Sequence, residues 1–220
     1  MAIAYIFSRM VLLVAPSRLA LPPVAVPVPY RKLILKGRRS ATENQVQAAL
    51  KAGGVDLILS VGFAFAADRR LSMGDLLLAP RVFGGADVYL DLPPLQAPGA
   101  VRGSLLTLVD EGLPPALHRG QRRLPPVYAF DDHAFWLARA AQAANVPCLV
   151  LRATLLESSE NRERDPLLPD LLAGRLARAA LREPRRWREI AQLPRSIRHC
   201  RAQLASALAV LLVLHGMAEK

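Results

Sequence analysis

The apolar residues of this chain are grouped in short runs separated by turn signals. The clearest run covers residues 57–61 and is aliphatic except for Ser60, which is typical of a strand buried on both faces. A second run at residues 75–79 follows Met73 and Gly74, a pair that favours a turn. The segment therefore predicts two strands joined by a short connector.

The glycine after the first run, Gly62, predicts a sharp turn at the end of that strand. Ligands of open α/β sheets bind beyond the carboxyl ends of such strands. We therefore expect residues 62–67 to form one wall of a binding site. The alternative is a tight turn with no ligand.

Similar patterns along the rest of the chain predict alternating strands and helices. Strands are expected at residues 2–7, 12–14, 32–35, 86–90, 104–109, 127–130 and 147–151. Helices are expected from a cap at Ser40 or Thr42 to residue 51, from a cap at Asp131 or Asp132 to residue 145, and from residue 167 onward with breaks at Pro184 and Pro194. The expected fold is a three-layer α/β/α domain with a mixed, mainly parallel sheet, in which residues 57–61, 127–130 and 148–151 are core strands. We expect a single domain over residues 1–220, with a basic helical extension at 168–220.

Two cysteines are the only thiols, and neither has metal-ligand spacing around it. Cys148 lies in an apolar run and Cys200 on a basic helix, so we expect a reduced, cytoplasmic protein with no metal and no cysteine nucleophile. Residues 1–15 lack a charged start, and Arg9 interrupts their apolar region, which favours a strand over a signal peptide. The apolar run at 207–214 is shorter than the roughly 20 residues that span a bilayer.

The charge is strongly positive and unevenly placed. Lysine and arginine total 29 against 18 acidic residues, and residues 175–201 hold nine arginines but only Glu183 and Glu189. This patch predicts either an anionic partner or a solvated surface. Few aromatic residues accompany the arginines, which argues against nucleic acid and leaves the inner face of a membrane.

The C-terminal helix has an apolar side that leaves two interpretations open. One side carries Ile197, Leu204, Leu208, Leu211 and Leu212. With Arg195, Arg198 and Arg201 nearby, this side could dock on an anionic membrane. The same side could instead pack on the domain core or on a second subunit.

Several short segments resemble one enzyme superfamily in their order and spacing. They are Ser60-Val61-Gly62, Asp68, Ser72-Met73-Gly74-Asp75-Leu76, Ala100-Val101-Arg102-Gly103-Ser104, Asp131 in YAFDDHAF, Val146-Pro147 and Leu151-Arg152-Ala153. Over residues 43–204 the chain resembles the purine and uridine phosphorylases, and within them the hopanoid-associated phosphorylases, or adenosylhopane nucleosidases. The resemblance implies cleavage of a purine nucleoside at its N-glycosidic bond, with adenosylhopane as substrate and adenine as product. It implies no cofactor, phosphate as a possible co-substrate, and a possible homo-oligomer.

The chain departs from this family at the positions that carry the chemistry. In the family a glutamate in a DMES turn holds the ribose, and an aspartate after the proline-containing strand protonates the base. His133 stands at the glutamate position, Leu156 at the aspartate position, and Phe65-Ala66 replaces a pair of glycines. The acidic residue after the first strand is also missing, because Ser8-Arg9-Met10 stands there. Loss of a general acid typically removes about 10² to 10⁴ in rate, or roughly 3 to 5 kcal/mol.

Neighbouring residues could take over these roles. A shift of one residue would bring Glu157 to the base as the catalytic acid, while Asp132 or His133 holds a ribose hydroxyl. Gly62, Phe63 and Asp131 are further candidates for substrate contacts, and Arg152 for phosphate. Each of these residues also has an alternative role without chemistry. Asp132 could be an N-cap, His133 a surface residue of the first helical turn, Glu157 part of a solvated polar segment, and Arg152 part of a structural ion pair or a surface residue. The chain is therefore either a nucleosidase or phosphorylase, or a binding or structural protein that has lost the chemistry.

Overall fold

A computed structural model describes residues 10–23, 29–36, 41–84, 88–93, 97, 99–107, 127–156 and 187–217. Its strands are β1 (Met10–Ala15), β2 (Tyr30–Ile34), β3 (Val55–Ala66), β4 (Leu76–Leu78), β5 (Arg81–Phe83), β6 (Tyr89–Asp91), β7 (Ala100–Arg102), β8 (Ser104–Thr107), β9 (Val127–Asp131) and β10 (Cys148–Leu156). Its helices are α1 (Thr42–Lys51), α3 (Ala134–Ala143) and α6 (Trp187–Met217). No helix in these ranges is long and apolar enough to cross a membrane.

The ten strands form one mixed sheet built around β3. The strand order is β6-β5-β8-β9-β3-β10-β4-β7, and β1 also pairs with β3 and carries β2 on its other side. The first half of β3 is parallel to β1, its last residues are antiparallel to β9, and β10 runs parallel beside it through both parts. Because β1 and β9 pair with different halves of β3, the sheet changes partners close to Gly62.

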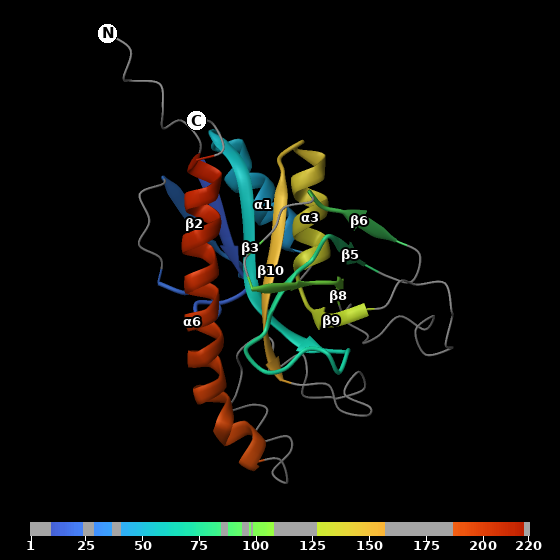
Figure 1. The fold of residues 1–220 in the computed structure, drawn as a ribbon. Coiled ribbons are helices and arrows are strands. Elements are labelled where there is room, and N and C mark those ends of the chain that lie inside the picture. The colour runs from blue at the N-terminus through green and yellow to red at the C-terminus, as the bar shows by residue number, and fades with distance from the viewer. Residues whose placement is uncertain are drawn as a thin grey trace.

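Helices cover the sheet on both faces, as the three-layer prediction requires. Figure 1 shows α6 on one side of β3 and β10, with α1 and α3 on the other side. Each face has its own apolar cluster. One contains residues of β3, β10 and α6, and the other contains residues of β3, α1 and α3. The expected α/β/α fold is confirmed, and residues 57–61, 127–130 and 148–151 all lie in strands.

The two central strands are longer than predicted, which corrects two expected loops. β3 does not turn at Gly62 but continues to Ala66, and β10 does not end before Arg152 but continues to Leu156. Side chains therefore alternate between the two faces beyond Gly62. Val61, Phe63 and Phe65 belong to the cluster on the α6 side, whereas Ala64 and Ala66 belong to the cluster on the α3 side.

The ends of the other elements correct smaller expectations. α1 has Ala41 at its N-cap and no capping side-chain hydrogen bond, so Thr42 is not the predicted cap, and Ser40 lies outside the described residues. The strand expected at 12–14 is β1, whereas the one expected at 2–7 and the loop at 114–126 lie outside the described residues. α6 runs through Pro194 without ending, contrary to the predicted break. The break expected at Pro184 lies outside the described residues.

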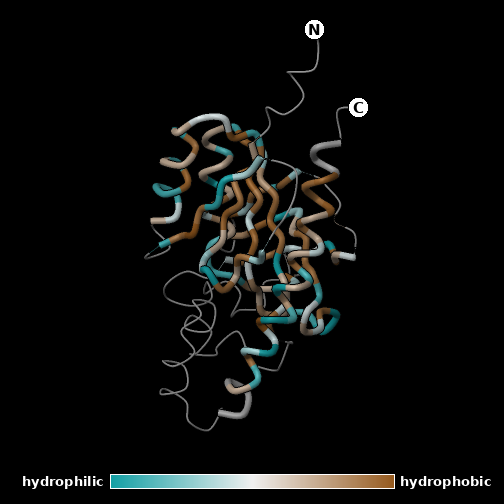
Figure 2. The backbone as a smooth tube through the Cα atoms, turned by 90° about the vertical axis from the view of Figure 1, so that its left-hand side faces the viewer, coloured by the Kyte–Doolittle hydropathy of each residue, from teal (hydrophilic) through white to brown (hydrophobic). Residues whose placement is uncertain are grey.

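The apolar side of α6 packs on the domain core. Ile197, Leu204, Leu208, Leu211 and Leu212 are all at most 7% exposed and belong to the cluster on this face of the sheet. Pro194 removes one backbone hydrogen bond of the helix. Leu193 before it and Ile197 after it are both buried, and this packing keeps the helix on the sheet at that point. Figure 2 shows that the apolar part of α6 lies beside the sheet and that its first turns are more hydrophilic. Of the alternatives that the sequence left open, core packing is the one observed within this chain.

Candidate functional site

A buried arginine connects the two central strands. Arg152 lies on β10 beside Gly62 of β3 and is 1% exposed. Its Nε and Nη2 donate to Asp131 Oδ2 at 2.9 and 2.7 Å. Its Nη1 donates to the carbonyls of Ser60 and Leu151 at 3.0 Å, and Nη2 also donates to Ser60 Oγ at 3.0 Å. A guanidinium has five N–H groups, and these five bonds use them all.

Arg152 therefore has no N–H group left for a phosphate. The structural ion pair, one of the two roles that the sequence left open for this residue, is the one present. The predicted contact between Arg152 and phosphate is corrected accordingly.

The carboxylate of Asp131 joins this arginine to the start of α3. Its Oδ1 accepts from Thr107 Oγ1 at 2.7 Å, and its oxygens lie 3.3 and 3.1 Å from the backbone N of Ala134. Thr107 Oγ1 in turn accepts from the backbone N of Phe135 at 2.9 Å. Two of the first N–H groups of α3 are satisfied in this way, so the buried network also caps the helix.

Small residues of β3 make room for the arginine. Ser60, Gly62, Ala64 and Ala66 follow one another at every second position of the strand, and successive side chains of a strand alternate between its faces. A Cβ atom added to Gly62 would lie 3.4 Å from Arg152 Nε and 3.3 Å from Pro16 Cδ. Gly62 thus allows the side chains of Pro16 and Arg152 to approach β3 closely, and the strand continues through it instead of making the predicted turn.

Two predicted site residues lie in the turn between β9 and α3. Asp132 is 6% exposed and His133 is 9% exposed, so both are buried but reach the surface. His133 Nδ1 lies 2.6 Å from Asp132 Oδ1, in a geometry that does not make a hydrogen bond. His133 occupies the N-cap position of α3 without a capping side-chain bond, and Asp131, one of the two caps predicted from the sequence, supplies that contact.

The structure brings together only part of the predicted set. Gly62, Asp131 and Arg152 are in contact or adjacent in the sheet, and Asp132 and His133 directly follow Asp131. Phe63 belongs to the cluster on the α6 side, so it is not brought together with them. Glu157 lies outside the described residues. The sequence analysis missed Thr107 and Ser60, because a single hydroxyl in a strand gives no sign of a partner 24 or 92 residues away.

The two cysteines have buried, neutral thiols. Burial raises the pKa of Cys148 to about 12 and that of Cys200 to about 11. Neither side chain is a thiolate near neutral pH, so neither serves as a nucleophile there. Among the described residues, no group of three His, Cys, Asp or Glu side chains is placed to hold a metal ion.

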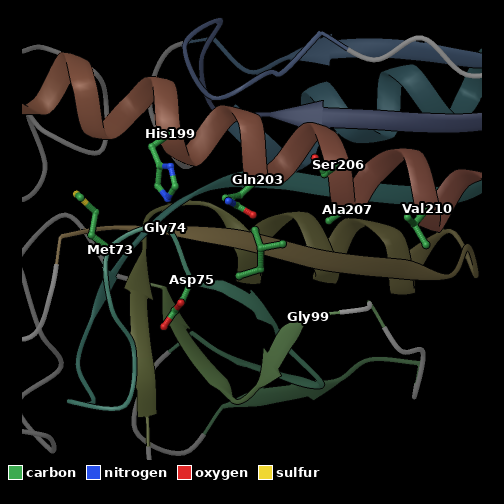
Figure 3. Close-up of a pocket in the computed structure, with 10 residues that line it drawn as sticks. Met73, Gly74, Asp75, Gly99, His199, Gln203, Ser206, Ala207 and Val210 are labelled. Atoms are coloured by element: carbon green, nitrogen blue, oxygen red, sulfur yellow. The ribbon is translucent and has the colours of Figure 1, made fainter.

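A groove of about 290 Å³ lies away from this network, between α6 and the turn before β4. Figure 3 shows His199 pointing from α6 toward Gly74, with Gln203 on the same helix and Gly99 on the far side, and Leu76 also lines the groove. Met73 and Val210, two apolar residues at its edge, are 43% and 40% exposed. None of the predicted site residues lines this groove.

Comparison with known proteins identifies the fold. No protein-family model matches the chain, and no curated protein matches it in sequence. Among solved structures, an MTAN from Chlamydia trachomatis is 16% identical, covers 93% of this chain and 97% of its own, and has a TM-score of 0.60. A 5'-methylthioadenosine/S-adenosylhomocysteine nucleosidase from Helicobacter pylori is 12% identical over 92% and 98%, with a TM-score of 0.61. A futalosine hydrolase from the same organism is 12% identical over 86% and 97%, with a TM-score of 0.55. The chain therefore has the fold of the nucleosidases and nucleoside phosphorylases.

Proposed function

We propose that this chain binds a purine nucleoside beside the later half of β3, where β10 runs parallel to it and the antiparallel β9 ends at Asp131, and cleaves its N-glycosidic bond. The observation that carries the proposal is the buried Arg152–Asp131 network, which fixes the start of α3 and with it Asp132 and His133. Ligands of α/β sheets collect at such strand ends. The shared fold with proteins that are named nucleosidases supports the same class of substrate.

The proposed chemistry assigns one task to each group. Asp132 and His133 hydrogen-bond to the ribose hydroxyls and hold the sugar. Glu157 gives a proton to the departing base while the bond between the base and the ribose breaks. A water molecule, or phosphate, forms the new bond to the same ribose carbon. When water attacks, it yields its proton to the solvent or to a nearby base, so the reaction needs no cofactor.

The finer proposal concerns the substrate. The resemblance of the sequence to the hopanoid-associated phosphorylases favours an adenosine joined to a lipid through its 5' position, that is adenosylhopane, with adenine as the product. Hydrolysis is favoured over phosphorolysis, because Arg152 has no N–H group left to bind phosphate.

The experiment that tests this function is an assay for adenine release. Purified protein is incubated with 5'-methylthioadenosine and with an adenosine that carries a long apolar 5' group, each with and without phosphate. Adenine should be released without phosphate. The nucleoside that releases it faster identifies the preferred 5' group. If no adenine appears with either nucleoside, the proposed activity is refuted.

A second candidate function is nucleoside binding without cleavage. It is favoured because His133 stands where the resembled family has a carboxylate. The carboxylate beside it in the same turn is that of Asp132. In that case calorimetry would show adenosine binding to a protein that releases no adenine. Binding and release measured on the same preparation therefore separate the two candidates.

We also propose a peripheral contact between α6 and an anionic membrane. The apolar side of the helix is buried, so the contact would rest on charge, with Arg195 and Arg198 exposed. Each arginine near an anionic surface contributes about 1 kcal/mol, and salt weakens the attraction. Sedimentation with phosphatidylserine vesicles should therefore show binding at low salt that is lost at high salt and in the variant with Arg195→Glu and Arg198→Glu. A variant that sediments like the unchanged protein would refute the contact.

A further inference from the structure

A buried hydroxyl near the network lacks a hydrogen-bond partner. Thr154, on β10, is 0% exposed, and its Oγ1 has no partner. A buried hydroxyl without a partner destabilises the protein, because burial has removed its hydrogen bonds to water. Such atoms are uncommon in folded proteins, and each one requires an explanation.

The backbone of Thr154 is held on both sides, in contrast to its hydroxyl. Its N donates to the Asp75 carbonyl at 2.9 Å, and its carbonyl accepts from the backbone N of Gly74 at 2.8 Å and from Cys200 Sγ at 3.2 Å. The residue is therefore fixed in place. Only the hydroxyl is left without a partner.

The position of Thr154 places it at the candidate site. It is two residues beyond Arg152 on β10, so both side chains lie on the same face of the sheet. Its partner on β3 is Ala64, whose side chain is small, and the next residue of β3 pairs with Phe130 just before Asp131. Strands lie about 4.8 Å apart, so the backbones of Thr154 and Asp131 are roughly 10 Å apart.

A second buried polar atom without a hydrogen bond belongs to the turn after β9. It is His133 Nδ1, which has the Asp132 carboxylate at 2.6 Å but makes no hydrogen bond. The two residues therefore belong to β10 and to the turn after β9, and these two strands flank the later half of β3.

We propose that the Thr154 hydroxyl contacts the ligand at this site and selects nucleosides by a hydrogen bond to a polar group of the base or ribose. The proposal rests on the proposed function, since it assigns Thr154 to the same nucleoside. A site that hydrogen-bonds a ligand through a buried group rejects analogues that lack the matching group, because the group is then left without a partner. The cost of the unpartnered hydroxyl in the free protein is then the source of selectivity.

Thr154→Val tests the proposal, because valine keeps the shape of threonine and removes only the hydroxyl. Thr42→Val is the matched control. Thr42 is also 0% exposed with an unpartnered Oγ1, but it lies at the start of α1, a helix that contributes no residue to the network around Arg152 and Asp131. Both variants should melt at the same temperature as the unchanged protein or higher, since each loses an unsatisfied hydroxyl. Only Thr154→Val should weaken adenosine binding, by about tenfold, and Thr154→Ser should bind like the unchanged protein.

The measurements are the melting temperature and the dissociation constant for adenosine, determined by calorimetry. Where adenosine is cleaved, the KM replaces the dissociation constant. If the Thr154→Val variant and the unchanged protein bind adenosine equally well, the proposal for Thr154 is overturned. Adenine release by the same preparation would still support the enzyme. Binding that depends on Thr154 in a protein that releases no adenine would refute the enzyme and keep the contact. Absence of any adenosine binding would overturn both.

Discussion

Replacing Arg152 by methionine is expected to lower the free energy of unfolding by about 3 to 5 kcal/mol, which is typical when one partner of a buried ion pair is removed. Methionine is of comparable length and apolar, so the change removes the charge and five hydrogen bonds without leaving a large cavity. The Asp131 carboxylate, whose side chain is 2% exposed, then stays buried without its guanidinium partner and keeps the Thr107 hydroxyl and the backbone N–H of Ala134. Urea unfolding followed by circular dichroism would measure the effect.

The matched control is Arg139→Met. Arg139 pairs with Glu43 between α3 and α1, but these side chains are 49% and 23% exposed. Exposed ion pairs contribute only about 0 to 1 kcal/mol, so this variant should be almost as stable as the unchanged protein. Equal losses for the two variants, or a loss below 1 kcal/mol for Arg152→Met, would show that the buried network does not stabilise the fold as described.

The strands of this fold could be predicted because each core strand is an apolar run. Residues 57–61 and 148–151 are buried on both faces, so their hydrophobicity alone indicates a central strand. The prediction failed where the strand needed small residues. Gly62 indicates a turn when read locally, but here it accommodates Arg152 and Pro16, which are distant in sequence.

The network at the site could not be predicted for a related reason. Arg152 contacts Ser60 across 92 residues, and Asp131 contacts Thr107 across 24. These pairs depend on which strands are neighbours and on their register, and neither property leaves a local pattern. Asp131 and Arg152 were selected because the apolar runs before them predict strand ends, while their partners were missed. Asp131 does end β9, but Arg152 lies in the middle of β10.

The register of β10 bears directly on the catalytic acid. Thr154 pairs with Ala64, but Leu156 pairs with Phe65, so one extra residue bulges between them. In a regular strand Leu156 would stand beside Ala66. The bulge therefore moves the count of β10 by one residue relative to β3. Glu157 lies outside the described residues, and the proposal that it acts as the acid rests on a shift of this size.

Glu157→Gln is therefore expected to reduce adenine release by about 10² to 10⁴, the usual contribution of a general acid, because glutamine cannot protonate the departing base. The KM should change little, since glutamine keeps the size and hydrogen-bonding reach of the side chain. Glu160→Gln is the matched control, because Glu160 belongs to the same polar segment and has no assigned role. Initial rates with 5'-methylthioadenosine would measure both variants. If both release adenine at the unchanged rate, Glu157 is a solvated residue and the acid must be sought elsewhere, with Asp132 and His133 as the nearest titratable groups that the structure describes in the turn after β9.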